Sequence, residues 1–549
     1  MESDVCAALG YADQIFINGK VLTVDPAFAV AESVAIRGKH ILAVGTSKDV
    51  SRLAGPHTDV VDLQGKCVLP GLIDTHAHVE RAGLLNVTVG FDDVSTVAEA
   101  QAQVRDMARK TPQGAWIRGR IWHPIAQLKE KRFLTRHDLD EAAPDHPVIL
   151  PIGHFSLVNS RALALAGVTR DTPDPDGGII HRDEKGEPNG VLEEAAEGLV
   201  NRLLPEPSFD QLVSQMKQAM AYFNSFGITS AISGAVSPCD VRVHHAIRRA
   251  DEATLRVSLM FAPTGSLNPS LSLEEWETLF SRIGVASDFG DEWVSLSGVK
   301  LQVDGGMTLG TAATREGYPH DPNYHGTIVI PQDRLNGFVA IANRHDWRVG
   351  IHAIGDAAID SVLDAYEGAH REKSIKGRRF ILLHGSLMRR DQMQRARDLD
   401  VRVDAQSAFL WDKGGAVTQH LGRRTAERAI PMRSMIDIMG LDLLAQGTDY
   451  PINPASPFIN MYVMTTRRDI KGEIYGAEEA ITREEAIRLY TSAASRYTFA
   501  EKLTGTIEPG KLADLVILSD DILTVPDEAL KNIRALRTIV GGRTVYRAS

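Results

Sequence analysis

The middle of the chain alternates short apolar runs with longer helical patterns, and this feature restricts the fold more than any other. Eight candidate strands are separated in this way between residues 70 and 500. They begin near Leu72, Ile228, Leu255, Leu296, Trp347, Arg379, Val401 and Leu443. Strands that alternate with helices form parallel sheets, and eight such units predict an α/β fold with a (β/α)8 barrel of the TIM type.

Both ends of the chain carry strand-like segments outside this alternating region. They comprise residues 14–19, 33–39 and 40–45 near the start, and residues 513–518 and 538–545 near the end. Glycines at the turns between them indicate small antiparallel sheets. We expect these sheets to join into one β-domain of residues 1–69 and 501–549, beside a barrel of residues 70–500.

The gap between the first two candidate strands is too long for a single helix. We therefore expect residues from about 80 to 226 to include an insertion after the first barrel strand. Strand-like pieces at residues 116–119 and 147–150 lie within it. Near the end of the barrel, Thr482 and Glu485 have the spacing of a capping box, which predicts a helix that closes the barrel.

Composition argues against several classes of function. The length of 549 residues suffices for a large barrel and a second domain. A formal net charge of −11 argues against nucleic acid and anionic membranes as partners. With only three cysteines, no basic and apolar leader, and no apolar run of membrane-spanning length, we expect a cytoplasmic protein.

Residues that bind metals follow several of the candidate strands. His76 and His78 end the first strand, and residues two apart in a strand point to the same side. Later strands end in His352, His384 and Asp449. Each residue alone is also compatible with a structural role, such as a hydrogen-bonded core histidine or an aspartate that caps a helix. Because barrel active sites lie at the carboxyl ends of the strands, the five together predict a metal centre.

Lys300 lies between Val299 and Leu301 in the fourth candidate strand. A lysine in a buried strand is costly unless it has a partner, and burial favours its neutral amine. A neutral amine can react with carbon dioxide to form a carbamate, which is an oxygen ligand able to bridge two metals. An ion pair with a buried acid is the alternative.

Several motifs resemble those of a known superfamily. Residues 70–78, which read PGLIDTHAH, and residues 505–516, which read GTIEPGKLADLV, are similar to the amidohydrolase superfamily. Other motifs resemble its family-3 branch, which includes N-substituted formamide deformylases. These motifs are Gly153-His154 with Asn159-Ser160, Val299-Lys300-Leu301 with Asp304-Gly305, His352-Ala353-Ile354-Gly355-Asp356, and Gly447-Thr448-Asp449-Tyr450-Pro451.

The resemblance implies a barrel beside a β-sandwich built from both termini, and it implies a homodimer. It implies that four histidines bind zinc or a similar metal, namely His76, His78, His352 and His384. Asp449 would be a ligand and proton shuttle, and Lys300 would be a bridging ligand as N6-carboxylysine. The site would hold one or two ions, with manganese or cobalt as alternatives to zinc.

Such a site predicts hydrolysis of a small molecule. Metal-activated water would attack a carbonyl, and Asp449 would return a proton to the leaving nitrogen. His154 is our candidate donor to the oxyanion, and a structural hydrogen bond in the insertion is its alternative. We expect cleavage of a C–N bond in an amide, N-formyl or N-acyl compound. Hydrolysis of an ester, lactone or other acyl bond and a non-catalytic scaffold are the alternatives.

Two positions depart from the family pattern. Gly306 to Thr311 stand where family members often have Ser-Leu-Gly-Ser-Arg, and Gly385-Ser386 stand where Ala-Gln is common. Both lie beside the expected pocket, so no known member's substrate is transferred to this chain. We expect residues 307–316 and 116–160 to determine selectivity.

Overall fold

The computed structural model describes residues 10–83, 88–91, 94–120, 122, 124–152, 155–175, 178–262 and 271–548. The candidate donor His154 lies outside these ranges. Within them, no helix is both long enough and apolar enough to cross a membrane.

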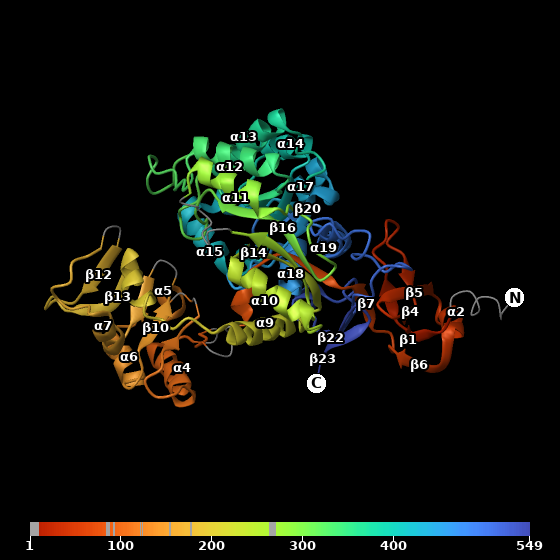
Figure 1. Ribbon diagram of the computed structural model, residues 1–549, viewed down its shortest axis with the longest axis horizontal. Helices are drawn as coiled ribbons and strands as arrows, with labels where there is room; N and C mark the ends of the chain where they lie inside the picture. The colour runs from red at the N-terminus through yellow and green to blue at the C-terminus, as the bar shows by residue number, and fades with distance from the viewer. Residues whose placement is uncertain are drawn as a thin grey trace. The chain divides into compact units, whose positions relative to one another are not determined.

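Eight parallel strands form one sheet, some of whose strands are labelled in Figure 1. In chain order the strands are β8 (Leu72–Ala77), β14 (Ile228–Val236), β15 (Arg256–Phe261), β16 (Val294–Gln302), β17 (Val349–Ala353), β18 (Ile381–His384), β19 (Arg402–Ala405) and β20 (Leu444–Gln446). Each strand pairs with the next one along the chain. Every strand begins within two residues of its expected position, and the (β/α)8 prediction is confirmed.

The first and last strands approach each other and leave the barrel nearly closed. The backbone N–H of Asp449 donates to the carbonyl oxygen of His76 at 2.6 Å. Thr448 donates to the Asp74 carboxylate twice, from its hydroxyl at 2.6 Å and from its backbone N–H at 2.9 Å. These bonds join the segment after β20 to β8, so residues more than 370 positions apart meet at this seam.

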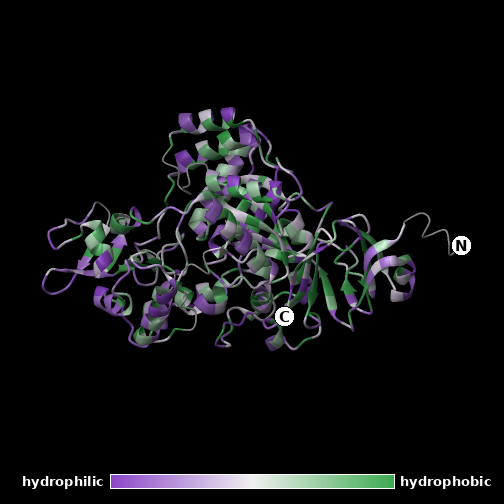
Figure 2. Cartoon of the chain, turned by 60° about the horizontal axis from the view of Figure 1, so that its bottom comes forward, coloured by the Kyte–Doolittle hydropathy of each residue, from purple (hydrophilic) through white to green (hydrophobic). Residues whose placement is uncertain are grey.

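Helices follow the barrel strands. They include α9 (Phe209–Asn224), α10 (Pro238–Arg249), α11 (Leu273–Ile283), α12 (Gln332–Arg344), α13 (Asp356–Glu372), α14 (Arg390–Asp398), α17 (Met432–Met439) and α19 (Arg483–Leu489). Helical ribbons in Figure 2 carry both hydrophobic and hydrophilic segments, as expected for helices with one buried face. Thr482 caps α19 in a capping box with Glu485, as its sequence predicts.

Strands from both ends of the chain form two further sheets. One sheet has the order β5-β4-β1-β6, and the other has the order β23-β22-β21-β7-β2-β3. Their bounds are β1 Ala12–Ile17, β2 Lys20–Leu22, β3 Val30–Ala31, β4 Ser33–Arg37, β5 His40–Gly45, β6 Ala54–Asp62, β7 Cys67–Pro70, β21 Leu515–Leu518, β22 Ala535–Val540 and β23 Arg543–Arg547. Phe16, Val34, Val68, Leu515 and Ile539 belong to one apolar core between them.

The expectation that these sheets are antiparallel throughout is wrong. The sheets are mixed, because β1 pairs with β6 and β2 pairs with β7 in parallel. Long connections separate the members of each pair, which permits the crossover that parallel strands need. The run 538–545 is a hairpin of β22 and β23, since Gly541 and Gly542 adopt positive φ values of 54° and 75° at its turn.

Residues Gly83–Leu212 form a separate compact unit after β8. Its five-stranded sheet has the order β12-β13-β11-β10-β9. The strands are β9 Ile117–Arg118, β10 Val148–Pro151, β11 Phe155–Val158, β12 Gly178–Arg182 and β13 Pro188–Glu194, and the helices include α4 Val97–Lys110, α6 Arg136–Ala142 and α7 Ser160–Ala166. Alternate residues of β10 enter two different apolar clusters, so the sheet is covered on both faces.

Candidate metal centre

The six candidate ligands all lie at one end of the barrel. His76 is in β8 and Lys300 is in β16, while His352 and His384 are in β17 and β18. His78 follows β8 directly, and Asp449 comes shortly after β20, behind Gly447 and Thr448. Because all the strands run in parallel, their carboxyl ends bring these side chains to the same rim.

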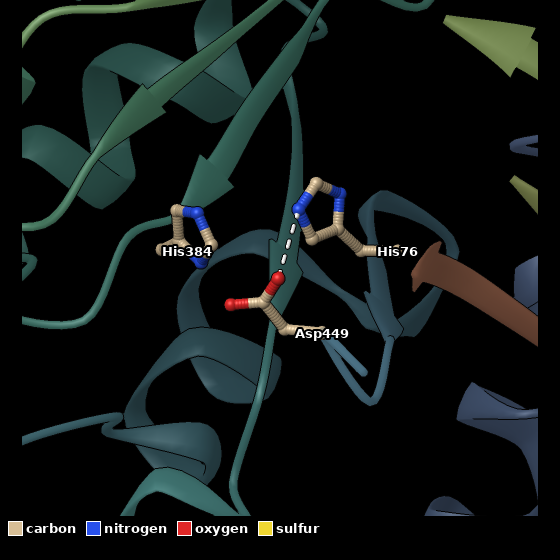
Figure 3. Close-up of side chains that lie close together, drawn as sticks. All are labelled: His76, His384 and Asp449. Atoms are coloured by element: carbon tan, nitrogen blue, oxygen red, sulfur yellow. Dashed lines mark ion pairs between the residues drawn. The ribbon is translucent and has the colours of Figure 1, made fainter. Parts of the chain in front are cut away.

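The Asp449 carboxylate lies between the first two histidines. Its Oδ1 is 3.5 Å from His76 Nε2 and 3.5 Å from His78 Nε2. Lys300 Nζ is 3.2 Å from the same His76 nitrogen. Figure 3 shows the carboxylate facing the imidazoles of His76 and His384.

The remaining imidazoles complete the cluster. The ring centroids of His352 and His384 are 4.4 Å apart, and those of His76 and His384 are 5.2 Å apart. One ligand atom from each of His76, His384 and Asp449 lies within 4.8 Å of the others, which suits a shared ion. All six positions that the sequence singles out as ligands therefore meet.

Burial keeps these histidines neutral. It lowers the pKa of His384 to about 4, and it lowers the pKa values of His76 and His352 well below their ordinary value. Neutral imidazoles offer the lone pairs that metals need. Burial raises the pKa of Asp449, but its hydrogen bond with His78 and the electrostatic influence of His384, His78 and Lys300 outweigh this effect and hold that pKa below its ordinary value.

Lys300 is almost fully buried, and two acidic residues influence its charge. Burial lowers the pKa of its amine to about 8, although the charges of Asp449 and Asp404 oppose the shift. The lowered pKa increases the fraction of neutral amine, which is the form that carbamate formation requires. In the described residues no ion pair joins Lys300 to either acid, and its amine instead contacts His76 Nε2 at 3.2 Å, so the ion-pair alternative has only the charges of the two acids in its favour.

Hydrogen bonds orient three of the rings. His384 Nδ1 lies 2.6 Å from the amide oxygen of Gln406, and His78 Nδ1 lies 3.0 Å from the carbonyl oxygen of Gly234. His352 Nε2 lies 3.1 Å from the carbonyl oxygen of Gly305. Since an oxygen acceptor binds a ring N–H, the second nitrogen of the neutral rings of His352 and His384 is left as an acceptor.

Sequence analysis missed the buried polar residues behind the ligands. Asp404 accepts a hydrogen bond from the Thr75 hydroxyl at 3.0 Å, and Gln406 donates to the Asp404 backbone carbonyl at 3.1 Å. Asp404 lies between Val403 and Ala405 in a fully buried strand. An acid in such a strand is the same kind of signal that singled out Lys300, and it was available in the sequence.

Two of the candidate residues have unusual backbone conformations. His384 has a φ of 75° and Asp449 has a φ of 56°, both in the left-handed region that favours glycine. Such conformations persist where surrounding contacts hold them, and they cluster at functional sites. His384 is the last residue of β18 and Asp449 lies in the loop after β20, so both conformations occur where the chain leaves the barrel sheet.

The donor set fits a divalent metal ion. It combines neutral imidazoles, an ionised carboxylate and an amine near its pKa. His76 Nδ1 is a buried polar atom with no hydrogen-bond partner in the described part of the chain, which is costly without a ligand. A parallel barrel with such a cluster at its carboxyl rim defines the class of barrel hydrolases with a metal centre.

Comparison with known proteins places the chain within that class. Residues 59–546 match the Amidohydrolase family, and the chain belongs to it and is a hydrolase. It is 32% identical to Protein LONG AFTER FAR-RED 3 of Arabidopsis thaliana, over 97% of this chain and 92% of that protein. It is 29% identical to an N-substituted formamide deformylase of Arthrobacter pascens, over 97% of this chain and 98% of the other.

A solved structure agrees with this assignment. The crystal structure of an uncharacterized metal-dependent hydrolase from Pyrococcus furiosus superposes with a TM-score of 0.74 and 27% identity. The match covers 93% of this chain and all of that chain. The fold and the family are therefore shared along almost the whole length.

Proposed function

We propose that this hydrolase cleaves the C–N bond of a small amide, N-formyl or N-acyl compound. The observation that carries the proposal is the convergence of four imidazoles, Lys300 and Asp449 at the barrel rim. The similarity to a deformylase of N-substituted formamides supports a C–N substrate. Since cysteines are few, we further propose that the protein acts in the cytoplasm.

Six residues would hold the metal: His76, His78, Lys300, His352, His384 and Asp449. We propose zinc, as one or two ions, with manganese or cobalt as substitutes, and N6-carboxylysine at Lys300 in a two-ion site. Such an ion lowers the pKa of a water from about 15.7 towards 7 and so makes it reactive at neutral pH.

Asp449 is the proposed proton carrier. Its carboxylate is ionised at neutral pH because its pKa lies below the ordinary value, so it can accept the proton of the attacking water. It would then donate that proton to the leaving nitrogen as the C–N bond breaks, which releases a neutral amine. His154 remains our candidate for the donor that stabilises the oxyanion.

The test begins with elemental analysis of the purified protein. We expect stoichiometric metal, and we expect a chelator to abolish activity and zinc or manganese to restore it. The metal-reconstituted enzyme is then offered N-formyl amines, N-acyl amines, cyclic amides and esters. Hydrolysis of the N-formyl or N-acyl compounds with the highest kcat/KM supports the proposal.

Other outcomes would identify the alternatives. A clear preference for esters or lactones would show that the same site breaks a C–O bond. Protein without metal that gains no activity when zinc or manganese is added would indicate a scaffold without catalysis.

A further inference from the structure

We propose that a cavity outside the metal centre binds a small organic anion with a carboxylate or phosphate head. The cavity has a volume of about 250 Å³ and lies beside the loops that follow β16, β17 and β18. The residues that matter here are Arg389, Arg424, Arg428, Leu387, Met388 and Leu421. We call it the arginine cavity. None of the six candidate metal ligands, all in described ranges, lines it.

Two of its arginines have no counterion among the residues that the structure describes. Arg424 lies in α16 (Arg423–Glu427) and Arg428 follows it directly, so the two are neighbours four residues apart on one helical face. Both are exposed, and within the described ranges neither side chain has an ion pair or hydrogen bond. Their neighbour Arg423, in contrast, pairs with Glu427 at 2.8 Å and with Glu473.

The third arginine is held in place by an acid. Arg389 Nε donates to Asp356 Oδ2, and the backbone N–H of Arg315 donates to Asp356 Oδ1 at 2.8 Å. The Asp356 carboxylate is therefore already occupied. Glu316, the other acid in the lining, is 3.4 Å from Arg389 and its side chain is 84% exposed. Three guanidinium groups thus face two carboxylates, and the cavity is positive within a chain of net charge −11.

Apolar side chains line another part of the cavity. Leu387, Met388 and Leu421 are each less than 10% exposed, so they form a fixed wall rather than a mobile surface. Guanidinium groups bind carboxylate and phosphate through paired N–H donors. A wall of this kind beside such donors fits a ligand that has an apolar body and an oxyanion head.

Calorimetric titration of the metal-loaded enzyme tests this inference with three probes: hexanoate, neutral hexanamide and inorganic phosphate. We expect hexanoate to bind most tightly and phosphate more weakly, because phosphate lacks an apolar body. Hexanamide should bind at least about tenfold more weakly than hexanoate, since it carries no charge. Added salt should weaken hexanoate binding because the arginines are exposed.

The double variant Arg424→Gln/Arg428→Gln locates the site. We expect its Kd for hexanoate to rise by about tenfold or more. The matched control Arg249→Gln/Arg282→Gln removes the same charge from α10 and α11, outside the cavity, and should leave that Kd unchanged. Thermal unfolding checks that both variants are folded, and Arg424→Lys/Arg428→Lys should bind with intermediate affinity because it keeps the charge without the paired donors.

Three results would overturn the inference. Hexanoate that binds the double variant as tightly as the wild type would place the anion elsewhere, for example at the metal. Hexanamide that binds as tightly as hexanoate would remove the role of the arginines. Phosphate that binds more tightly than hexanoate would remove the role of the apolar wall. The variants leave every candidate metal ligand unchanged. Failure of the titration would therefore refute the anion site alone, and failure of the substrate panel would refute the proposed function alone.

Discussion

At the scale of single residues, Asp449 combines a strained backbone with a buried, ionised carboxylate. We predict that Asp449→Asn lowers kcat by at least about a hundredfold, because the amide can neither accept nor return the proton. Asparagine also tolerates the left-handed conformation, so the fold should persist. Steady-state kinetics and elemental analysis of the same sample provide the measurement.

The metal content of that variant separates two roles of Asp449. Retained metal with lost turnover is the expected result for a proton carrier. Full activity would exclude Asp449 as the proton carrier, whereas loss of the metal would show that its main contribution is ligation.

Gln406 orients the His384 ring through a 2.6 Å contact with Nδ1, and both side chains are almost fully buried. We predict that Gln406→Met weakens metal affinity by about 10- to 100-fold, because the ring loses the acceptor that fixes its orientation. Competition with a chelator measures this affinity. Gln446→Met is the matched control, since Gln446 is a buried glutamine at the end of β20 whose amide oxygen binds the backbone N–H of Ser407. Equal affinities for both variants would contradict the prediction.

At the scale of elements, sequence patterns located the barrel strands because a parallel strand is buried on both faces and reads as a continuous apolar run. The ligands could be predicted for the same reason: His384 and Asp449 stand where such runs end. Asp404 interrupts such an apolar run and could be singled out from the sequence, but its partner Thr75 could not, because the two positions are 329 residues apart and meet only in the closed barrel. Strand direction in the terminal sheets likewise depends on long-range pairing.

The loops after β16 and β17 are joined by one buried carboxylate. Asp304 accepts the backbone N–H groups of Ala313, Ile354 and Gly355, each at 2.9 Å. We predict that Asp304→Ala lowers the free energy of unfolding by about 3 kcal/mol or more, because three donors lose their acceptor. The midpoint of urea unfolding reports this change.

Asp304→Asn is the control for this prediction. It keeps one oxygen acceptor and nearly the same volume, so its midpoint should lie between those of Asp304→Ala and the wild type. If Asp304→Ala unfolded at the wild-type midpoint, the carboxylate would not hold the two loops together.

At the scale of the whole molecule, polar contacts fasten the barrel to the domain formed by both termini. Lys39 pairs with Glu292 at 2.7 Å, and the Thr538 hydroxyl donates to the Asn224 carbonyl oxygen at 2.6 Å. The Lys39 side chain is half exposed, so its ion pair with Glu292 contributes little to the free energy of unfolding. Buried contacts between the two parts should therefore contribute more.

A buried ion pair between the two parts joins Arg256 in β15 to Asp514, which directly precedes β21. Arg256 Nε is 2.7 Å from Asp514 Oδ2, and its Nη2 is 3.0 Å from Oδ1. Both side chains are less than 10% exposed. We predict that Asp514→Ala costs about 3–5 kcal/mol of unfolding free energy, because it leaves a buried guanidinium without its counterion.

Removing both charges of the Arg256–Asp514 pair should lower the free energy of unfolding less than removing one of them. The double variant Arg256→Met/Asp514→Leu removes both charges of the pair and replaces them with side chains of similar size. We therefore expect it to lose less free energy of unfolding than Asp514→Ala alone. Urea unfolding of both variants and the wild type measures the difference. The prediction would be contradicted if the double variant were less stable than Asp514→Ala. In that case the attraction between the two charges would exceed the cost of removing them from water, and the lone guanidinium of Asp514→Ala would reach water.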